Sequence, residues 1–186
     1  MGLQEYSHFG LGFHEGLIGS LRKADSLLLD RGYLQQYDPP LTVYNRPRNT
    51  FVADFVGNPT MNLVKFSAER KDDHTCILHH KDMKLEYTAK DVLPSSLDEV
   101  TIGVRPENVL VSEGEGIKVK VDTSLPSGME TILNLRLGDD VMLICVMIGS
   151  VDYPSDSVIS VCFKEDQVLM FDGEGNFATA GSVKFI

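Results

Sequence analysis

The sequence lacks the motifs that mark the common enzyme classes. Its 186 residues contain no Gly-x-x-x-x-Gly-Lys-[Ser/Thr] phosphate loop and no His-Glu-x-x-His, Gly-x-Ser-x-Gly or Cys-x-x-Cys motif. Each of these motifs holds a phosphate, a metal or a nucleophile at a fixed spacing. The sequence by itself therefore reveals no catalytic site.

Positive charge and tryptophan are also scarce. Lys and Arg number 17 against 27 Asp and Glu, which gives a net charge of −10, and Trp is absent. An acidic surface repels phosphate backbones, and base stacking needs exposed aromatic side chains beside basic ones. We therefore expect no nucleic-acid partner.

Long apolar runs and paired cysteines are missing as well. The longest apolar run covers 141–148, whereas a membrane-spanning helix needs about 20 residues. The N-terminus shows no basic region followed by an apolar core, so we expect neither a secretory signal nor direct membrane insertion. Cys76, Cys145 and Cys162 are widely spaced, which favours reduced, buried thiols in a cytoplasmic protein.

The first third of the chain predicts short elements separated by Gly and Pro. The run 26–30 reads as a buried strand, and Asp38 is a candidate N-cap for a short helix over 40–45. Asn49 is a candidate N-cap for a second helix over 50–56. The apolar face expected on that helix comprises Phe51, Val52, Phe55 and Val56.

From Met61 onward the hydrophobic pattern changes to period two. Ile117, Val119 and Val121, for example, alternate with charged residues, as in a half-buried strand. Many short strands at this spacing indicate a small barrel or a sandwich. The predicted strands are 62–67, 75–80, 84–88, 100–104, 108–112, 117–125, 130–137, 141–148, 157–163 and 168–171.

One cluster of potential metal ligands lies within a predicted strand. His74, Cys76, His79 and His80 fall in the run HTCILHH. Side chains alternate faces along a strand, and Cys76 and His80 would stand about 13 Å apart at 3.3 Å per residue, too far to share one zinc ion. We interpret the run as an exposed strand edge with solvated histidines and expect no metal.

Two further motifs have structural interpretations. Asp30 ends the run LLLD as the aspartate of a Walker B strand would, but Arg31 replaces the glutamate that should follow, so a plain strand end is the better interpretation. Arg105-Pro106-Glu107 follows an apolar strand. The residues leave open whether Arg105 and Glu107 form a structural ion pair or contact a partner.

The segment from Ala24 to Val64 resembles the junction that follows the nucleotide-binding domain in sugar-importer-type ABC transporter ATPases. The matching residues are Gly32, Leu34 and Gln36, then Pro40, Val43 and Tyr44, and finally Pro47, Phe51, Val52, Ala53, Phe55, Val56, Gly57, Pro59, Met61 and Asn62. Three downstream stretches are similar to that family's elements: Ile102 to Glu107, Leu125 to Thr131, and Val168 to Asp172.

The resemblance implies a mainly β fold with an OB-fold-like (TOBE, molybdate-binding-protein-like) β-barrel preceded by two short helices. Residues 1–36 would be a remnant or degenerate end of an ATPase domain, disordered or paired with another chain. Residues 37–60 would form a two-helix connector, and residues 61–186 the barrel. The Walker A, signature and Walker B motifs are absent, so we expect no enzyme activity and no cofactor in this chain; ATP and Mg²⁺ belong to the full-length parent.

The function that the resemblance implies is a non-catalytic regulatory and dimerisation domain of an ABC importer's ATP-binding subunit, for a sugar or related solute. It would be cytoplasmic and peripheral to the inner face of the membrane. Expected partners are a second copy in a weak homodimer, permease subunits reached through the missing ATPase domain, and a regulatory protein. The alternative function is a small-oxyanion (molybdate-type) binding module, which the net charge opposes.

The interface candidates are the turns that carry the family's elements. They mix an ion-pairing Arg with Met and Phe that we expect to be exposed. We expect reversed charges at Arg105 and Glu130 to abolish dimerisation and leave the fold intact, whereas unfolding would indicate a structural role. The candidate residues are Arg105, Pro106, Glu107, Gly128, Met129, Glu130, Phe171 and Asp172.

Overall fold

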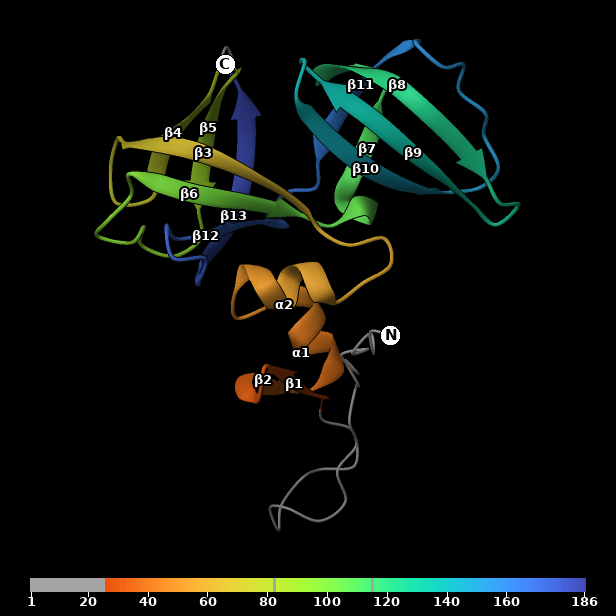
Figure 1. The fold of residues 1–186 in the computed structure, drawn as a ribbon. Helices are drawn as coiled ribbons and strands as arrows, with labels where there is room; N and C mark the ends of the chain where they lie inside the picture. The colour runs from red at the N-terminus through yellow and green to blue at the C-terminus, as the bar shows by residue number, and fades with distance from the viewer. Residues whose placement is uncertain (1–25, 82, 115) are drawn as a thin grey trace, which may run out of the picture.

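A computed structural model describes residues 26–81, 83–114 and 116–186 and shows a mainly β protein with two short α-helices (Figure 1). The predicted fold class is confirmed. The expectation that residues 1–23 are disordered or paired falls outside the described residues. Within the described part of the chain, no helix has the length and apolar character that crossing a membrane requires.

The chain enters through a β-hairpin. Strand β1 (Ser26–Asp30) pairs antiparallel with β2 (Tyr33–Asp38). Arg31 and Gly32 join them with φ angles of 47° and 85°. Positive φ at both central residues is the geometry that a two-residue hairpin turn requires, which explains the glycine. The predicted strand β1 is confirmed, but its burial is only partly right, since Ser26 and Leu28 are buried and Leu29 is 47% exposed.

Two short helices follow the hairpin, α1 (Pro40–Asn45) and α2 (Thr50–Phe55). The predicted cap of α2 is confirmed, because the Asn49 side chain accepts a hydrogen bond from the Val52 N–H at 2.9 Å. The predicted cap of α1 is wrong. Pro39 is its N-cap, with no side-chain capping bond.

The apolar face expected for α2 is only partly right. Val52 and Ala53 are buried, whereas Phe55 is 38% exposed and Phe51 is half-buried. Asp38 does not cap α1; its side chain accepts a hydrogen bond from the Gln36 side chain at 3.0 Å. Side-chain contacts with the hairpin and the sheets, rather than helical periodicity alone, decide which residues of these one-turn elements are buried.

Six antiparallel strands close into a barrel in the order β12-β13-β5-β4-β3-β6. We call this part the barrel lobe. Its strand β4 pairs with β3 on one side and β5 on the other, so the interpretation of this strand as an exposed edge is wrong. The strands are β3 (Asn62–Arg70), β4 (Thr75–His80), β5 (Met83–Ala89), β6 (Glu99–Val104), β12 (Val168–Phe171) and β13 (Phe177–Phe185).

A second sheet lies between β6 and β12 in the sequence and beside the barrel in space (Figure 1). It has the order β10-β9-β8-β11-β7, and we call it the second lobe. Its two edges approach each other, since the Cys145 thiol on β10 lies 3.0 Å from the Val109 carbonyl oxygen on β7. A 3₁₀ helix, η1 (Pro106–Asn108), leads into the strands β7 (Val109–Ser112), β8 (Ile117–Pro126), β9 (Glu130–Leu137), β10 (Val141–Ile148) and β11 (Val158–Phe163).

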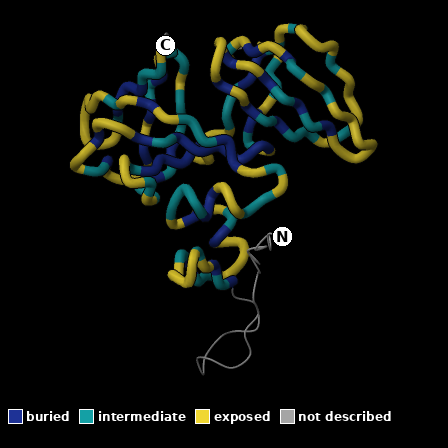
Figure 2. The backbone as a smooth tube through the Cα atoms, in the orientation of Figure 1, coloured by how far each residue is buried: buried dark blue, intermediate teal, exposed yellow. Residues whose placement is uncertain are grey.

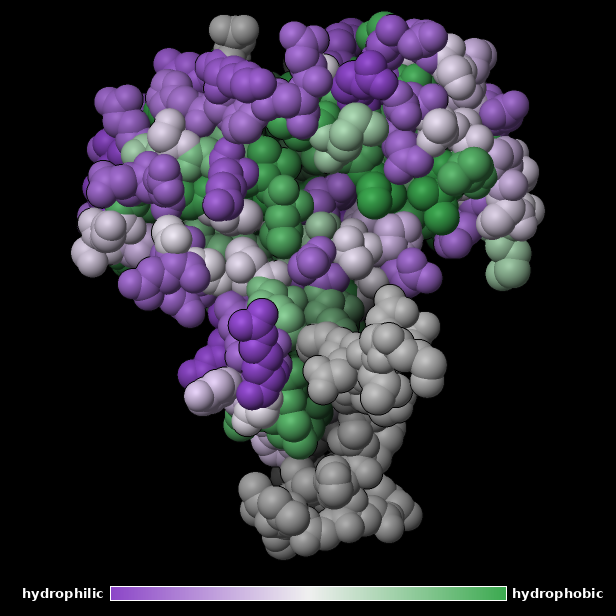
Figure 3. All heavy atoms as spheres, viewed as in Figure 1, coloured by the Kyte–Doolittle hydropathy of each residue, from purple (hydrophilic) through white to green (hydrophobic). Residues whose placement is uncertain are grey.

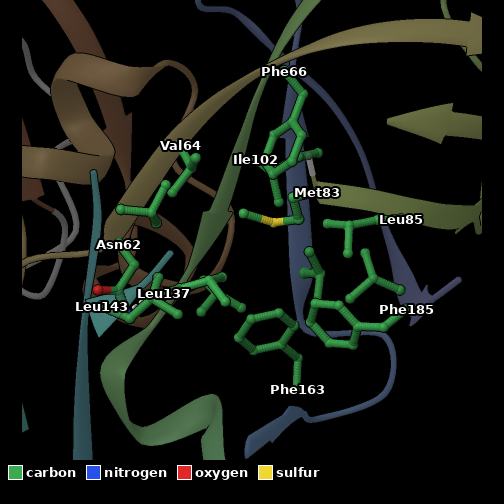
Figure 4. A pocket seen from close by; sticks show the side chains of 14 residues that line it. Asn62, Val64, Phe66, Met83, Leu85, Ile102, Leu137, Leu143, Phe163 and Phe185 are labelled. Atoms are coloured by element: carbon green, nitrogen blue, oxygen red, sulfur yellow. Dashed lines mark hydrogen bonds between the residues drawn. The ribbon is translucent and has the colours of Figure 1, made fainter. Parts of the chain in front are cut away.

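The two lobes share one apolar core, seen as dark blue segments where they meet in Figure 2. A narrow apolar cavity of about 30 Å³ lies at this seam (Figure 4). Phe66 and Met83 line it from the barrel lobe, and Leu137 and Leu143 line it from the second lobe. Because the packing is continuous across the seam, the two lobes form one structural unit rather than two independent domains.

The prediction of buried thiols is confirmed for Cys76 and Cys145 and is wrong for Cys162. Burial raises the pKa of Cys76 and of Cys145 to about 11 in each case. At neutral pH both therefore remain thiols, which pack as small apolar groups. Cys162 is half-buried on β11, and all three are free.

Candidate functional site

The most densely bonded part of the molecule surrounds Arg105, which follows β6 and precedes η1. The side chain is only 4% exposed. Its Nη2 donates to the Tyr44 carbonyl at 2.8 Å, and its Nη1 donates to the carbonyls of Ala53, at 3.2 Å, and Val56. These carbonyls belong to the C-terminal ends of α1 and α2. One guanidinium group thus satisfies unpaired carbonyls of both helices and places a positive charge at their negative ends.

Tyr44 covers the Arg105 guanidinium and links it to the second lobe. The Arg105 Cζ lies 4.1 Å from the centroid of the Tyr44 ring, a cation–π contact. The Tyr44 hydroxyl donates to Glu107 Oε1 at 2.7 Å. Burial, followed by the hydrogen bond and charge of Glu107, raises the pKa of Tyr44 to about 12. The phenol therefore stays neutral and able to donate at physiological pH.

Burial lowers the pKa of Arg105 from its high ordinary value, with Tyr44 and Glu107 acting in the opposite direction. A guanidinium group retains its charge under such a shift. In the described part of the chain its Nε has no hydrogen-bond partner, and the two Nη atoms make the hydrogen bonds of the side chain. The arrangement depends on the fork geometry that distinguishes Arg from Lys.

Gly57 leaves room for the Arg105 side chain. It has φ +116°, and a Cβ at this position would lie 3.0 Å from Arg105 Nη1 and 3.2 Å from the Pro59 carbonyl oxygen. Any other residue would combine a strained backbone with a tight contact. The glycine of the segment Phe-Val-Gly-x-Pro is thereby explained.

A second polar contact, made by Asn62, joins the two lobes. Asn62 on β3 pairs with Val104 on β6, the residue before Arg105. Asn62 is 8% exposed, and its Nδ2 donates to the Val104 carbonyl at 3.2 Å and to the Ile144 carbonyl at 2.9 Å. The Ile144 N–H donates back to Asn62 Oδ1 at 2.6 Å. The amide therefore ties β3 and β6 of the barrel lobe to β10 of the second lobe.

The connector also binds the far end of the barrel. The Thr50 N–H donates to the Gly175 carbonyl at 2.8 Å, and the Phe177 N–H donates to the Arg48 carbonyl at 2.9 Å. Arg46 lies over the Phe177 ring, with its Cζ 5.5 Å from the centroid. The helices are therefore fastened to the barrel at both β6 and the β12–β13 turn.

The interface candidates fall into two groups in the structure. Pro106 is buried beside Arg105, and Glu107 is exposed and accepts the Tyr44 hydrogen bond. Gly128 and Met129 lie in the β8–β9 turn at the far end of the second lobe, and Glu130 begins β9 (Figure 1). The structure therefore does not bring the two sets together.

Phe171 and Asp172 have structural surroundings. The expectation that Phe171 is exposed is wrong, since it is fully buried in a cluster with Ala53, Met61 and Leu169. Asp172 Oδ1 accepts hydrogen bonds from the N–H groups of Glu174, at 3.0 Å, and Asn176, at 2.8 Å. Asp172 thus shapes the turn that contacts the connector.

The histidine run does not assemble a metal site. Cys76 faces the barrel core, His79 lies 3.8 Å from Glu69, and His80 bonds elsewhere. Among the described residues, no group of three or more His, Cys, Asp and Glu side chains is placed to hold a metal ion. His80 is also only 24% exposed in its side chain, so the interpretation as a solvated histidine is wrong for this residue.

Sequence reasoning missed Tyr44 and Asn62 as contact residues. Both stand in the stretch that carries the family resemblance, which was the available signal. Asn62 bonds to backbone groups of Val104 and Ile144, and Tyr44 contacts the side chains of Arg105 and Glu107. Only the folded chain reveals these partners. The sequence left open whether Arg105 and Glu107 form a structural ion pair or contact a partner. In the structure Arg105 donates to helix carbonyls, and Glu107 accepts from Tyr44.

Comparison with known proteins gives a consistent set of relatives, although no family model matches the chain. The chain is 30% identical over 149 residues to the sn-glycerol-3-phosphate import ATP-binding protein UgpC of Ruegeria pomeroyi, covering 80% of this chain and 40% of that protein. It is 34% identical over 154 residues to the xylose/arabinose import ATP-binding protein XacK of Haloferax volcanii, covering 79% of this chain and 39% of that protein.

A third relative is the maltose/maltodextrin import ATP-binding protein MalK of Photobacterium profundum. It is 34% identical over 110 residues, covering 59% of this chain and 28% of that protein. The chain thus spans about two fifths or less of the length of these relatives. The similarity relates it to one portion of each.

Proposed function

Because this chain is homologous to the C-terminal portion of the ATP-binding subunits of sugar and glycerol-phosphate ABC importers, we propose that it is a non-catalytic regulatory and dimerisation domain of such a subunit. The observation that carries this proposal is the Arg105 contact with both connector helices. A regulatory domain must transmit motion between the ATPase domain and its own binding faces. The buried guanidinium supplies a rigid link for that purpose.

The proposed mechanism is mechanical. Arg105 holds α1 and α2, and Asn62, which pairs with Val104 beside it, holds the second lobe. A rotation of the hairpin that precedes the helices would therefore move both lobes together rather than bend the connector. Through an attached ATPase domain the chain would meet the permease subunits, at the cytoplasmic face of the membrane, and a regulatory protein could act on its exposed faces.

An exposed apolar patch at the tip of the second lobe is the proposed dimer contact. Met129 is 86% exposed and Ile148 is 95% exposed. The Gly149 N–H donates to the Met129 carbonyl at 2.9 Å, so the two side chains stand on adjoining backbone. Leu125 and Val151 are exposed on the neighbouring segments. On the face seen in Figure 3, hydrophobic residues gather along the seam and over the second lobe.

We define the tip patch as Leu125, Met129, Ile148 and Val151. Exposed Met and branched apolar residues of this kind are typical of interface cores. Four side chains bury little area when a second copy docks on them. We therefore expect a weak two-fold dimer with a dissociation constant of about micromolar or higher.

Two measurements test the proposal. Isothermal titration should detect no binding of ATP with Mg²⁺ to the chain, because nothing in its sequence can hold the phosphates. Low-micromolar, magnesium-dependent binding would overturn the non-catalytic assignment. Sedimentation velocity should detect a concentration-dependent dimer, and a strict monomer would overturn the dimerisation function.

A small-oxyanion binding function is the second candidate, and one groove favours it. Lys65, His79, His80 and Lys81 line a polar groove of about 250 Å³ on the barrel lobe. Glu99 lies in the same wall, and Asp140 already pairs with Lys81 at 2.6 Å. Titration with molybdate, sulfate and phosphate tests this candidate, since binding lost on Lys65→Ala would support it.

A further inference from the structure

A polar groove lies where the end of α1 meets the barrel lobe. Arg46, the C-cap of α1, lines it from the connector, and Lys90 and Asp91 line it from the segment after β5. Asp166 lines it from the turn before β12. Figure 1 shows the connector helices below β12 and β13. The volume of about 460 Å³ falls within the range usual for small-molecule sites, and we call this site the connector groove.

The two carboxylates of the groove are each held by a hydroxyl group of β13. Thr179 is fully buried, and its Oγ1 accepts a hydrogen bond from the Asp91 N–H at 3.2 Å and lies 3.3 Å from Asp91 Oδ2. Ser182 Oγ accepts from the Asp166 N–H at 2.9 Å and lies 3.4 Å from Asp166 Oδ1. Because both carboxylates are positioned from behind, a ligand that binds them restricts little further side-chain motion.

The polar groups on the other walls are free to bind a ligand. Arg46 lies over the Phe177 ring, with its Cζ 5.5 Å from the centroid, and this contact orients the guanidinium. Arg46 makes no side-chain hydrogen bond to another residue that the structure describes, and neither do the side-chain amides of Asn45 and Gln167, which also line the groove. The groove therefore offers unused donors and acceptors next to the two carboxylates.

The balance of charge in the groove selects the class of ligand. Arg46 and Lys90 oppose a cation, whereas Asp91 and Asp166 oppose an anion. A hydroxyl group both donates and accepts, so a molecule with several hydroxyl groups can bond to basic, acidic and amide side chains at once.

The groove also has an apolar part. Leu169 on β12 and Ala180 on β13 line it, and Leu169 is only 6% exposed. Two apolar side chains among charged ones match a ligand that carries C–H groups between its hydroxyl groups. A sugar or a polyol has this pattern, and inorganic ions do not.

We propose that the connector groove binds a neutral, polyhydroxylated small molecule, a sugar or a polyol. Such a ligand bonds to Arg46 on the connector and to Asp91 and Asp166 on the barrel lobe at the same time. It therefore strengthens the attachment of α1 to the barrel lobe. The site goes beyond the proposed dimerisation function and does not depend on it, because the tip patch lies in the second lobe.

An amide NMR titration of the whole chain tests the proposal. The probes are glycerol, xylose, glucose and maltose, and glycerol distinguishes a short polyol from the sugars. We expect saturable shifts of the Arg46, Asp91, Asp166 and Gln167 amides with at least one probe, at a dissociation constant of about 0.1–10 mM, since the groove is open to water.

Three results of this titration would overturn the proposal. The first is the absence of saturable shifts with all four probes at about 100 mM. The second is a set of shifts confined to amides outside the groove. The third is tighter binding at these amides by sodium phosphate or magnesium chloride, which represent small anions and cations.

Two variants with matched controls identify the groove as the binding site. Arg46→Gln and Asp166→Asn should each weaken binding by about tenfold or more, because each removes a charged hydrogen-bonding partner. Arg48→Gln, at an exposed position of the connector, and Asp156→Asn should stay within about twofold of the wild type. Asp156 matches Asp166, since both have positive φ and pair with a lysine. Unchanged binding by both groove variants, or equal weakening by the controls, would overturn the proposal.

Measurements on the unaltered chain keep the test decisive if a variant fails to fold. At a probe concentration ten times the dissociation constant, the unfolding equilibrium constant in urea should fall by about tenfold. The Arg46 N–H, which bonds to the Thr42 carbonyl at 2.8 Å, should exchange its hydrogen more slowly with ligand bound. Unchanged exchange at α1 in the saturated chain would overturn the bridging role of the ligand.

Discussion

The side-chain amide of Asn62 exchanges two hydrogen bonds with the backbone of Ile144. Asn62 Nδ2 donates to the Ile144 carbonyl at 2.9 Å, and the Ile144 N–H donates to Asn62 Oδ1 at 2.6 Å. The amide copies the donor and acceptor of a neighbouring strand. It therefore pairs with β10, an edge of the second lobe, and fixes that edge to the barrel.

Asn62→Asp removes the donor of this pair while keeping the shape of the side chain. It places a carboxylate against the Ile144 and Val104 carbonyls. We expect a loss of about 2–4 kcal/mol in the free energy of unfolding at neutral pH, because a buried charge would face two acceptors. Urea denaturation measures it.

Asn45→Asp is the matched control, since Asn45 is exposed at the end of α1. It should change the stability by less than about 0.5 kcal/mol. An Asn62→Asp variant as stable as this control would show that the pair with Ile144 does not hold the lobes together.

Arg105→Lys tests the contact with the connector helices. A lysine ammonium is a point donor and cannot reach the Tyr44, Ala53 and Val56 carbonyls at once. We expect a loss of about 2–3 kcal/mol in stability and faster amide hydrogen exchange in α1 and α2. Arg48→Lys, at an exposed position of the connector, is the control.

The burial of Arg105 also changes what charge reversal at this position can show. A glutamate there would face three helix carbonyls in a buried site, so Arg105→Glu should unfold the chain rather than separate a dimer. An Arg105→Glu chain that remains folded, with unchanged exchange in the helices, would contradict the structural role.

Tyr44 gives a prediction at high pH. The raised pKa, about 12 against an ordinary value near 10, means that the folded chain favours the neutral phenol. The stabilisation is complete below about pH 10 and is lost as the pH rises toward 12. Tyr44→Phe, which removes the hydroxyl and its bond to Glu107, should lower stability by about 1 kcal/mol or less near neutral pH, because the site is partly exposed.

Stability measured at a series of pH values checks this sign. The difference between the wild-type chain and Tyr44→Phe should shrink and then reverse above about pH 10. Tyr33→Phe, at the exposed start of β2, is the control. A difference that grows with pH would contradict the hydrogen bond from Tyr44 to Glu107.

Alternating strands such as β9 were predictable because one face is buried, and fully buried β12 was predictable as a short apolar run. The boundaries of β4, β9, β10 and β12 agree with the sequence pattern, as do the bounds of α1. Strand β13 was missed because its sequence FATAGSVKF is rich in small residues. Its Gly181 packs against the Tyr87 ring, where any Cβ would clash, so the strand is defined by its neighbour rather than by its own hydrophobicity.

The division into two lobes could not be derived from periodicity. Strands that close a barrel and strands that form a second sheet share the same period of two. The roles of Arg105 and Asn62 were hidden for a related reason, since their acceptors are backbone carbonyls brought from distant segments. The predicted N-cap of α1 was wrong because Asp38 lies in β2, where its carboxylate accepts a hydrogen bond from the Gln36 side chain.

The measurement that tests the proposed function most directly is sedimentation velocity of the chain and its tip-patch variants. At concentrations from about 1 to about 200 μM, the wild-type chain should shift from monomer toward dimer. The double variant Met129→Glu, Ile148→Glu should remain monomeric with unchanged stability. Val92→Glu is the control, because it also places a glutamate at an exposed apolar position, but in the barrel lobe; this variant should dimerise like the wild type. A wild-type chain that stays monomeric at the highest concentration, or a double variant that dimerises as before, would contradict the account.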